Sequence, residues 1–215
     1  MLRKGDTIIE VMLAVTVFSL VSVGVYVIMN RSVNSLQTSL EVTLVRQQMD
    51  AQVEMIRMIY SQAREAEIPA AINNWQNVIT ASSMVSSSVP SLPDLIQDDI
   101  RCVDPPTSNR FIIHPNTGVA VGGGSSAVFR RADITTPVSL NPVPYASVSV
   151  AAGDPSIVHA NGIWIQVVRG GSSIPGQPDY PQYYDFHVRA CWSSAGDSTV
   201  PVTLGTITRI YDAAR

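Results

Sequence analysis

The chain has 215 residues, of which 46% are hydrophobic, so it is too apolar for a disordered segment and long enough for one domain with additions. Only 14% of the residues are charged, the formal net charge is −3, and Lys4 is the single lysine. This balance supplies no basic surface for a phosphate backbone, and no specific nucleic-acid partner is expected. Two cysteines exclude a disulfide-dense miniprotein and a four-cysteine zinc site.

The N-terminal segment has the composition of a membrane-spanning helix. From Ile8 to Met29 the chain is apolar, and its interruptions are Glu10, Thr16, Ser19, Ser22 and Gly24. At about 1.5 Å per residue, a helix of this length crosses the ~30 Å hydrocarbon core of a bilayer. Arg3 and Lys4 precede the segment and are expected to stay in the cytoplasm, which places the residues after Met29 outside.

The simplest alternative is a plain uncleaved signal anchor, and Glu10 argues against it. An ordinary secretory signal has a small-residue cleavage site after its apolar region. Here Asn30-Arg31-Ser32 follows instead. A charged side chain costs about 2.5–3.5 kcal/mol at the centre of a membrane helix and less near an end, so it usually marks a site with a partner.

The order of residues around Glu10 resembles the class III signal of type IV prepilins and pseudopilins. Lys4-Gly5 is followed by Asp6-Thr7-Ile8-Ile9-Glu10-Val11 and then by the apolar helix, and the resemblance ends at about Asn30. It implies that a membrane prepilin peptidase cuts between Gly5 and Asp6, that the new amine is methylated, and that Glu10 acts in assembly. This family usually has Phe or Met at the first mature position, so Asp6 points to a minor subunit.

After Met29 the apolar residues become periodic, at steps of mostly three and four residues, which predicts an amphipathic helix. The apolar stripe comprises Val33, Leu36, Leu40, Leu44, Met49, Val53, Ile56, Tyr60 and Ala63. The predicted solvated face comprises Gln37, Glu41, Arg46, Gln47, Asp50, Glu54, Arg57 and Arg64. Since the first proline is Pro69, one helix of about 90 Å is predicted from about Thr7 to about Glu67. A coiled coil is the alternative for the outer part, but sustained heptads are lacking.

The remaining sequence predicts a β-rich head with loops rich in serine, proline and glycine. The strand candidates are Arg110–His114, Gly118–Val121, Ala127–Ile134, Tyr145–Ala151, Gly162–Arg169, Tyr184–Trp192 and Val202–Tyr211. In the clearest candidate, Tyr184, Phe186, Val188, Ala190 and Trp192 share one face. Asp185, His187, Arg189 and Cys191 share the other face, where the first three predict a solvated stripe.

These segments predict an α+β fold, with a long N-terminal helical spine packed on an antiparallel β-sheet head. The resemblance to prepilins implies the same arrangement, a pilin-like α/β roll. The expected boundaries are a leader at 1–5, a transmembrane helix at 6–29, an amphipathic continuation at 30–67, and the head at 68–215.

Cys102 and Cys191 lie in the exported part of the chain, where oxidation is permitted. The resemblance implies a disulfide between them, because many pilins join parts of their C-terminal region by one. Two separate buried thiols are the alternative. On the strand reading, the bridge would cross the outer face of the sheet.

The sequence offers no recognisable active site. His114, His159 and His187 are dispersed, without metal-ligand spacing, and Gly122–Ser126 lacks the lysine of a phosphate-binding loop. Trp75, Trp164 and Trp192 are expected in the core rather than at a ligand. No catalytic residue, cofactor or metal is therefore predicted.

Together the features predict a structural subunit of a type IV pilus-like filament. The resemblance implies a single-pass cytoplasmic-membrane protein with an extracytoplasmic C-terminus, which moves to a pilus at the cell surface. Its partners would be other pilin subunits, prepilin peptidase, the membrane and the pilus assembly platform. A type II secretion pseudopilin is one alternative. A membrane-anchored extracytoplasmic binding domain or hydrolase that never polymerises is another.

Overall fold

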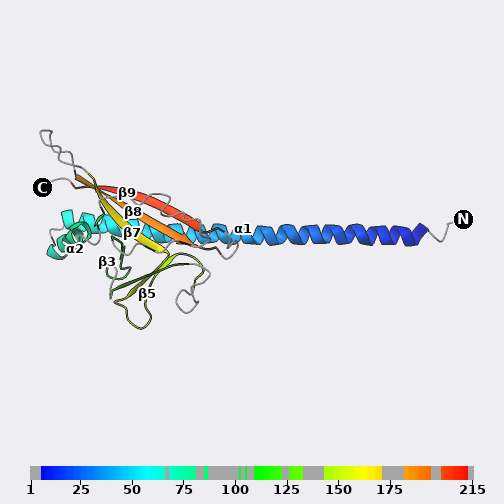
Figure 1. Cartoon of the computed structure of the whole chain (residues 1–215), viewed down its shortest axis with the longest axis horizontal. Helices are drawn as coiled ribbons and strands as arrows, with labels where there is room; N and C mark the ends of the chain where they lie inside the picture. Colours follow the sequence, from blue (N-terminus) through cyan, green and yellow to red (C-terminus); the bar gives the residue numbers. More distant parts are fainter. Residues whose placement is uncertain are drawn as a thin grey trace.

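A computed structural model describes residues 6–65, 68–80, 85–86, 102, 105, 109–122, 126–132, 143–170, 182–194 and 200–212. Its dominant feature is a continuous 60-residue helix, α1 (Asp6–Glu65), which projects far beyond a β-rich head (Figure 1). No proline interrupts α1, and its second half is rich in good helix formers such as glutamine, arginine and glutamate. The leader, including Gly5, lies outside the described residues.

The two halves of α1 have opposite surroundings. Every side chain from Ile8 to Leu36 is exposed, with Phe18 at 73% and Leu20 at 74%. From Glu41 to Ala63 one face of the helix is buried under the head. This one helix is long and apolar enough to cross a membrane.

The buried stripe of α1 begins later than the sequence predicted. Leu36 and Leu40 were expected on it but are 69% and 61% exposed, because the head covers the helix only from about Glu41 onward. Glu41 was expected in solvent and is instead 2% exposed. The observed stripe advances in steps of three and four residues, as helix geometry requires, and comprises Val45, Met49, Gln52, Val53, Ile56, Ile59 and Ala63.

A second helix, α2 (Pro69–Thr80), packs on α1, and the sequence analysis did not predict it. Its sequence carries two helix signals that were missed. Pro69 occupies the first helical position, where a missing N–H costs nothing. The buried residues Trp75, Val78 and Ile79 follow helical spacing.

The main sheet lies along the buried face of α1 in the order β3-β2-β7-β8-β9, and β1 pairs with β7 (Figure 1). Its pairings are antiparallel except that of β1 with β7, so the predicted α+β fold with a helical spine and a sheet head is confirmed. The strands are β1 (Val85–Ser86), β2 (Phe111–Ile113), β3 (Ala120–Gly122), β7 (Ile163–Gly170), β8 (Gln182–Trp192) and β9 (Val202–Asp212).

A second sheet of three strands was not anticipated. It has the order β4-β6-β5, with bounds β4 (Ala127–Arg130), β5 (Ser147–Val150) and β6 (Val158–Asn161), and β4 runs parallel to β6. Each predicted strand segment overlaps an observed strand, whereas β1 and β6 were missed. Gly162 joins β6 to β7 and so links the two sheets.

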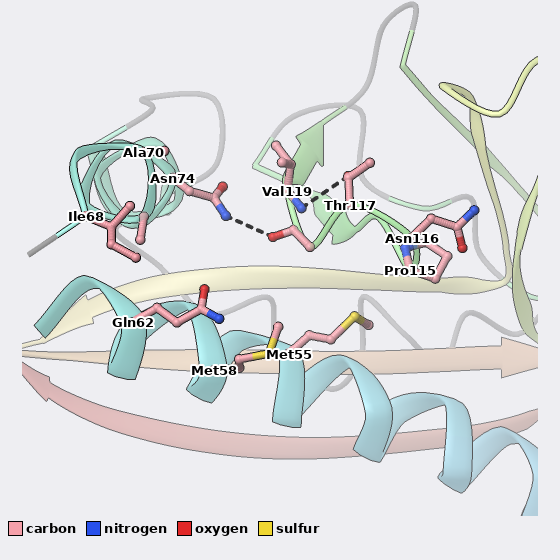
Figure 2. A pocket seen from close by; sticks show the side chains of 12 residues that line it. Met55, Met58, Gln62, Ile68, Ala70, Asn74, Pro115, Asn116, Thr117 and Val119 are labelled. Carbon is pink, nitrogen blue, oxygen red and sulfur yellow. Dashed lines mark hydrogen bonds between the residues drawn. The ribbon is translucent and has the colours of Figure 1, made fainter. Parts of the chain in front are cut away.

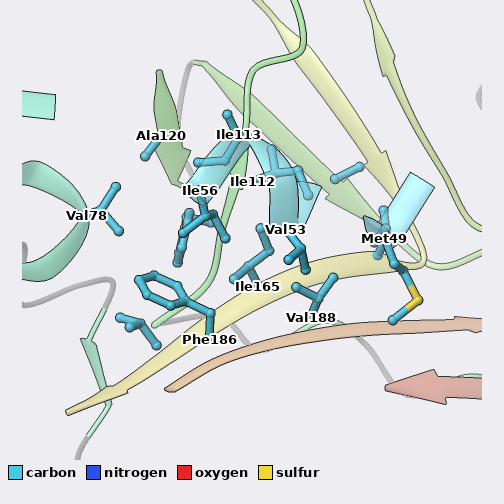
Figure 3. Packing of buried hydrophobic residues seen from close by; sticks show 14 of the residues in the cluster. Met49, Val53, Ile56, Val78, Ile112, Ile113, Ala120, Ile165, Phe186 and Val188 are labelled. Carbon is cyan, nitrogen blue, oxygen red and sulfur yellow. The ribbon is translucent and has the colours of Figure 1, made fainter. Parts of the chain in front are cut away.

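The core lies between α1, α2 and the inner face of the main sheet. Figure 3 shows Val53 and Ile56 of α1 facing Ile165 and Phe186. Burial of each such side chain contributes about 1.5–3 kcal/mol, so this layer supplies most of the stability of the head. The three tryptophans are buried, as expected.

Two buried polar side chains of α1 fix the register of the helix on the sheets. Gln52 donates to the Ile113 carbonyl at 3.2 Å and accepts from the Ile113 N–H at 2.8 Å. Glu41 accepts from Trp192 Nε1 at 3.1 Å. The hydrophobic effect is not directional, whereas these hydrogen bonds form in one position of the helix only.

We expect Gln52→Leu to lower the free energy of unfolding by about 2–4 kcal/mol, because both backbone groups of Ile113 lose their bonds while staying buried. Urea unfolding of the full chain in detergent, followed by tryptophan fluorescence, measures the change. Gln47→Leu, on the exposed side of the same helix, is the control. Equal stability of the two variants would show that Gln52 does not hold the helix.

Candidate functional site

The first half of α1, from Ile8 to Leu36, is apolar and exposed, and the head does not cover it. The hydroxyl of Thr16 donates to Leu13 O at 2.8 Å, and that of Ser19 donates to Val15 O at 2.8 Å. These polar groups are satisfied within the helix, as a helix in hydrocarbon requires. The half therefore suits a lipid or helix-lined environment.

Glu10 is a charged side chain in this half that has no such partner. Its side chain is exposed, and no hydrogen bond or ion pair joins it to any residue in the described part of the chain. A carboxylate held in an apolar environment needs a cation or donor from elsewhere. Asp6 is the first residue of α1, four positions before Glu10, so the two backbone positions lie on the same helix face.

In the head, Cys102 and Cys191 form a disulfide with a Cα–Cα distance of 5.7 Å. This is the pairing expected from the sequence, on the outer face of β8. Trp164 packs beside the bridge, and Phe129 of β4 covers the cluster. The bridge therefore ties the chain before β2 to the C-terminal end of β8, near Phe129 of the second sheet.

We expect Cys191→Ser to lower the stability of the head by about 2–5 kcal/mol, because the unfolded chain regains the entropy that the closed loop removes. Membrane insertion should not change, since the bridge lies in the head and not in the apolar segment of α1. Limited proteolysis of membrane preparations tests this expectation, with Ser193→Ala as a nearby control. Equal protease resistance of the variant and the wild type would contradict it.

A cleft of about 540 Å³ lies between α1, α2 and the turn that joins β2 to β3 (Figure 2). Asn74 of α2 closes one side by donating to Gly118 O at 2.8 Å and accepting from Ala120 N at 3.4 Å. The lining side chains that the structure describes are not ionisable, so they offer no general acid or base. They include Met55, Met58, Gln62, Ile68, Pro115 and Val119.

The histidines stay apart, and the structure gives one of them a clear local role. His114 Nδ1 accepts from the Asn116 N–H at 3.1 Å, so Nε2 carries the proton and donates to Pro155 O at 2.9 Å. This ring holds the β2–β3 turn beside the β5–β6 connection. Among the described residues, no three His, Cys, Asp or Glu side chains are placed to hold a metal ion.

His187 corrects the sequence analysis. It was expected on a solvated stripe but is 6% exposed, between Gln166 of β7 and Ile207 of β9 on the outer face of the sheet. Burial, and then the nearby charge of Arg189, lower its pKa, and Asp185 opposes them only in part. The ring is therefore uncharged at neutral pH.

No family model, no curated protein and no solved structure matches this chain. A long apolar N-terminal helix packed on an antiparallel sheet is compatible with a pilin-like fold.

Proposed function

We propose that this chain is a structural subunit, of the minor-pilin type, in a type IV pilus-like filament. Prepilin peptidase removes the leader after Gly5, the apolar half of α1 anchors the subunit in the cytoplasmic membrane, and the same half later packs among the helices of other subunits. The head then faces outward. The role is mechanical rather than enzymatic, in adhesion, motility, DNA uptake or secretion.

The observation that carries the proposal is the contrast between the two halves of α1. The second half is buried against its own head, whereas large apolar side chains from Ile8 to Leu36 find no cover in the described structure. Each would cost about 1.5–3 kcal/mol in water. A bilayer covers such a helix before assembly, and a bundle of identical helices covers it afterwards.

Glu10 supports polymerisation over simple anchoring. After cleavage, Asp6 would carry a new α-ammonium at the start of the helix, a charge that is costly to bury alone. The Glu10 carboxylate of a neighbouring subunit, displaced along the stack, is its natural counter-ion. A plain anchor gains nothing from a carboxylate at this depth.

Asp6 modifies this pairing. Its backbone position shares a helix face with Glu10, and a carboxylate at the first position of a helix is favoured by the positive end of that helix. The two carboxylates of one face either repel each other or share one incoming amine. We therefore expect Asp6→Phe to have a milder effect on assembly than loss of Glu10.

We expect Gly5→Val to leave the full-length precursor in the membrane. A peptidase that cuts directly after residue 5 must approach the backbone closely, and a branched side chain obstructs that approach where glycine has no Cβ. Immunoblots of membranes from cells that express the peptidase would show the precursor alone. Leu2→Val is the control and should be cleaved normally. Cleavage of the Gly5→Val protein at the wild-type rate would refute the assigned site.

A further inference from the structure

The outer edge of the main sheet is formed by β9, a long strand. Its eleven residues pair in register with β8 from Val202 to Asp212, and no strand in the described part of the chain lies on its other side. Figure 1 shows β9 at this edge. A strand at an edge presents unpaired N–H and C=O groups that can bond another extended chain.

A groove crosses the middle of this edge. Gly205 of β9 lies opposite Arg189 of β8, and a Cβ built at Gly205 would meet nothing within 4 Å. The cavity there has a volume of about 350 Å³ and is lined by His187, Val188, Arg189, Thr203, Leu204, Gly205, Thr206 and Ile207. Because Gly205 has no side chain, β9 leaves space between Arg189 and the open edge.

The groove holds Arg189, a cation for which the described residues supply no counter-ion. Arg189 is partly buried, and burial lowers its pKa, yet arginine stays charged at neutral pH. No hydrogen bond or ion pair joins it to any described residue. Arg209, on the same face, is by contrast fully paired. It donates to Asp185 through two hydrogen bonds of 2.7 and 2.8 Å, and its guanidinium lies 3.9 Å from the Tyr183 ring centre.

None of the other ionisable side chains near the groove pairs with Arg189. Arg46 and Asp50 of α1 line a neighbouring cavity with Leu204, Gly205 and Thr206, and their charges are opposite in sign. His187 is uncharged at neutral pH, as described above, and Asp185 is engaged by Arg209. Arg189 is therefore a partly buried positive charge that no described carboxylate pairs with. Such a guanidinium favours a carboxylate, which it can bind through two parallel hydrogen bonds.

We propose that β9 accepts an extended peptide as an additional strand, and that an aspartate or glutamate of this peptide enters the groove at Gly205 and pairs with Arg189. Main-chain bonds along the edge would supply affinity, and the groove would supply specificity, as in other cases of strand addition. The edge borders α1: Tyr60 donates to the Tyr211 carbonyl, at one end of β9, at 2.7 Å, and Arg46, Met49 and Asp50 line a cavity with Leu204, Gly205 and Thr206. This proposed peptide site does not depend on polymerisation of the chain.

The first test uses the full chain in neutral-detergent micelles and two fluorescein-labelled peptides of alternating valine and threonine. One has a central glutamate and the other has glutamine in its place. Fluorescence anisotropy should show that the glutamate peptide binds at least about tenfold more tightly, because the glutamine leaves Arg189 without its counter-ion. Equal affinity of the two peptides, or binding of neither, would overturn the proposal.

Two variants locate the binding. Arg189→Gln removes the charge. Gly205→Val fills the groove, at a position where a Cβ has room, and valine is a residue that favours strands. Each should weaken binding of the glutamate peptide by about tenfold or more. Arg57→Gln, an exposed arginine on α1, is the charge-matched control and should bind like the wild type. Unchanged binding by Gly205→Val, with its fold confirmed by circular dichroism, would contradict the assignment.

Hydrogen exchange separates strand addition from simple anion binding. The bound peptide should slow exchange of the outward amides of β9 and leave those of β3, at the opposite edge, unchanged. Acetate should slow exchange at neither edge. Binding that acetate abolishes fully and that leaves β9 exchange unchanged would mean a carboxylate site without a strand, which overturns the proposal in this form.

Discussion

Glu10→Ala should yield a protein that is processed and held in the membrane but is missing from the filament fraction. The amount of protein in the filament fraction should fall at least about tenfold, because the α-ammonium of the neighbouring subunit would be buried without its counter-ion. Insertion should not suffer, since removal of a charge makes the helix more apolar. Immunoblots of sheared filaments beside membranes measure both quantities.

Glu54→Ala provides the matched control for this substitution. It removes an exposed glutamate from the same helix, in the half that carries the head, and costs only a surface pair with Arg57. It should enter filaments normally. If Glu10→Ala entered at the wild-type level, charge pairing would be wrong for this subunit, and a tip position without an upper neighbour would explain Glu10 better.

Gly162→Ala should lower the free energy of unfolding by about 2–5 kcal/mol. Gly162 has a φ of +63°, and a Cβ there would collide with Cys191 O and Ala132 Cβ. Its N–H donates to Arg130 O and its carbonyl accepts from Cys191 N, both at 2.7 Å. The collision therefore disturbs the junction where the two sheets meet.

Urea unfolding, followed by tryptophan fluorescence, measures the effect of Gly162→Ala. Gly153→Ala is the control, because a Cβ at Gly153 would meet nothing within 4 Å and that glycine is not in the left-handed region. Its stability should match the wild type. A Gly162→Ala protein as stable as Gly153→Ala would show that the corner between the sheets tolerates a side chain.

The helix and most strands were predictable from the sequence because their signals are local. Alternation of apolar and polar residues located β8, and the helical spacing after Met29 located the second half of α1. The disulfide was expected from the resemblance to prepilins. What the structure adds is which partner covers each face.

The failures share one cause: burial depends on partners distant in the chain. Glu41 resembles a surface residue until Trp192 supplies a buried donor, and His187 resembles one until neighbouring strands cover it. The strand β6 is short, and because its pairing with β4 is parallel, the sequence has no hairpin turn that would indicate this contact. The groove at Gly205 arises only from the pairing of β8 with β9.

The most direct test of the filament account is the intact mass of the chain recovered from sheared surface filaments. The account predicts that the chain is present in this fraction and that its mass begins at Asp6, without Met1–Gly5. A chain that remains in the membrane with its leader attached, in cells with an active prepilin peptidase, would contradict the account.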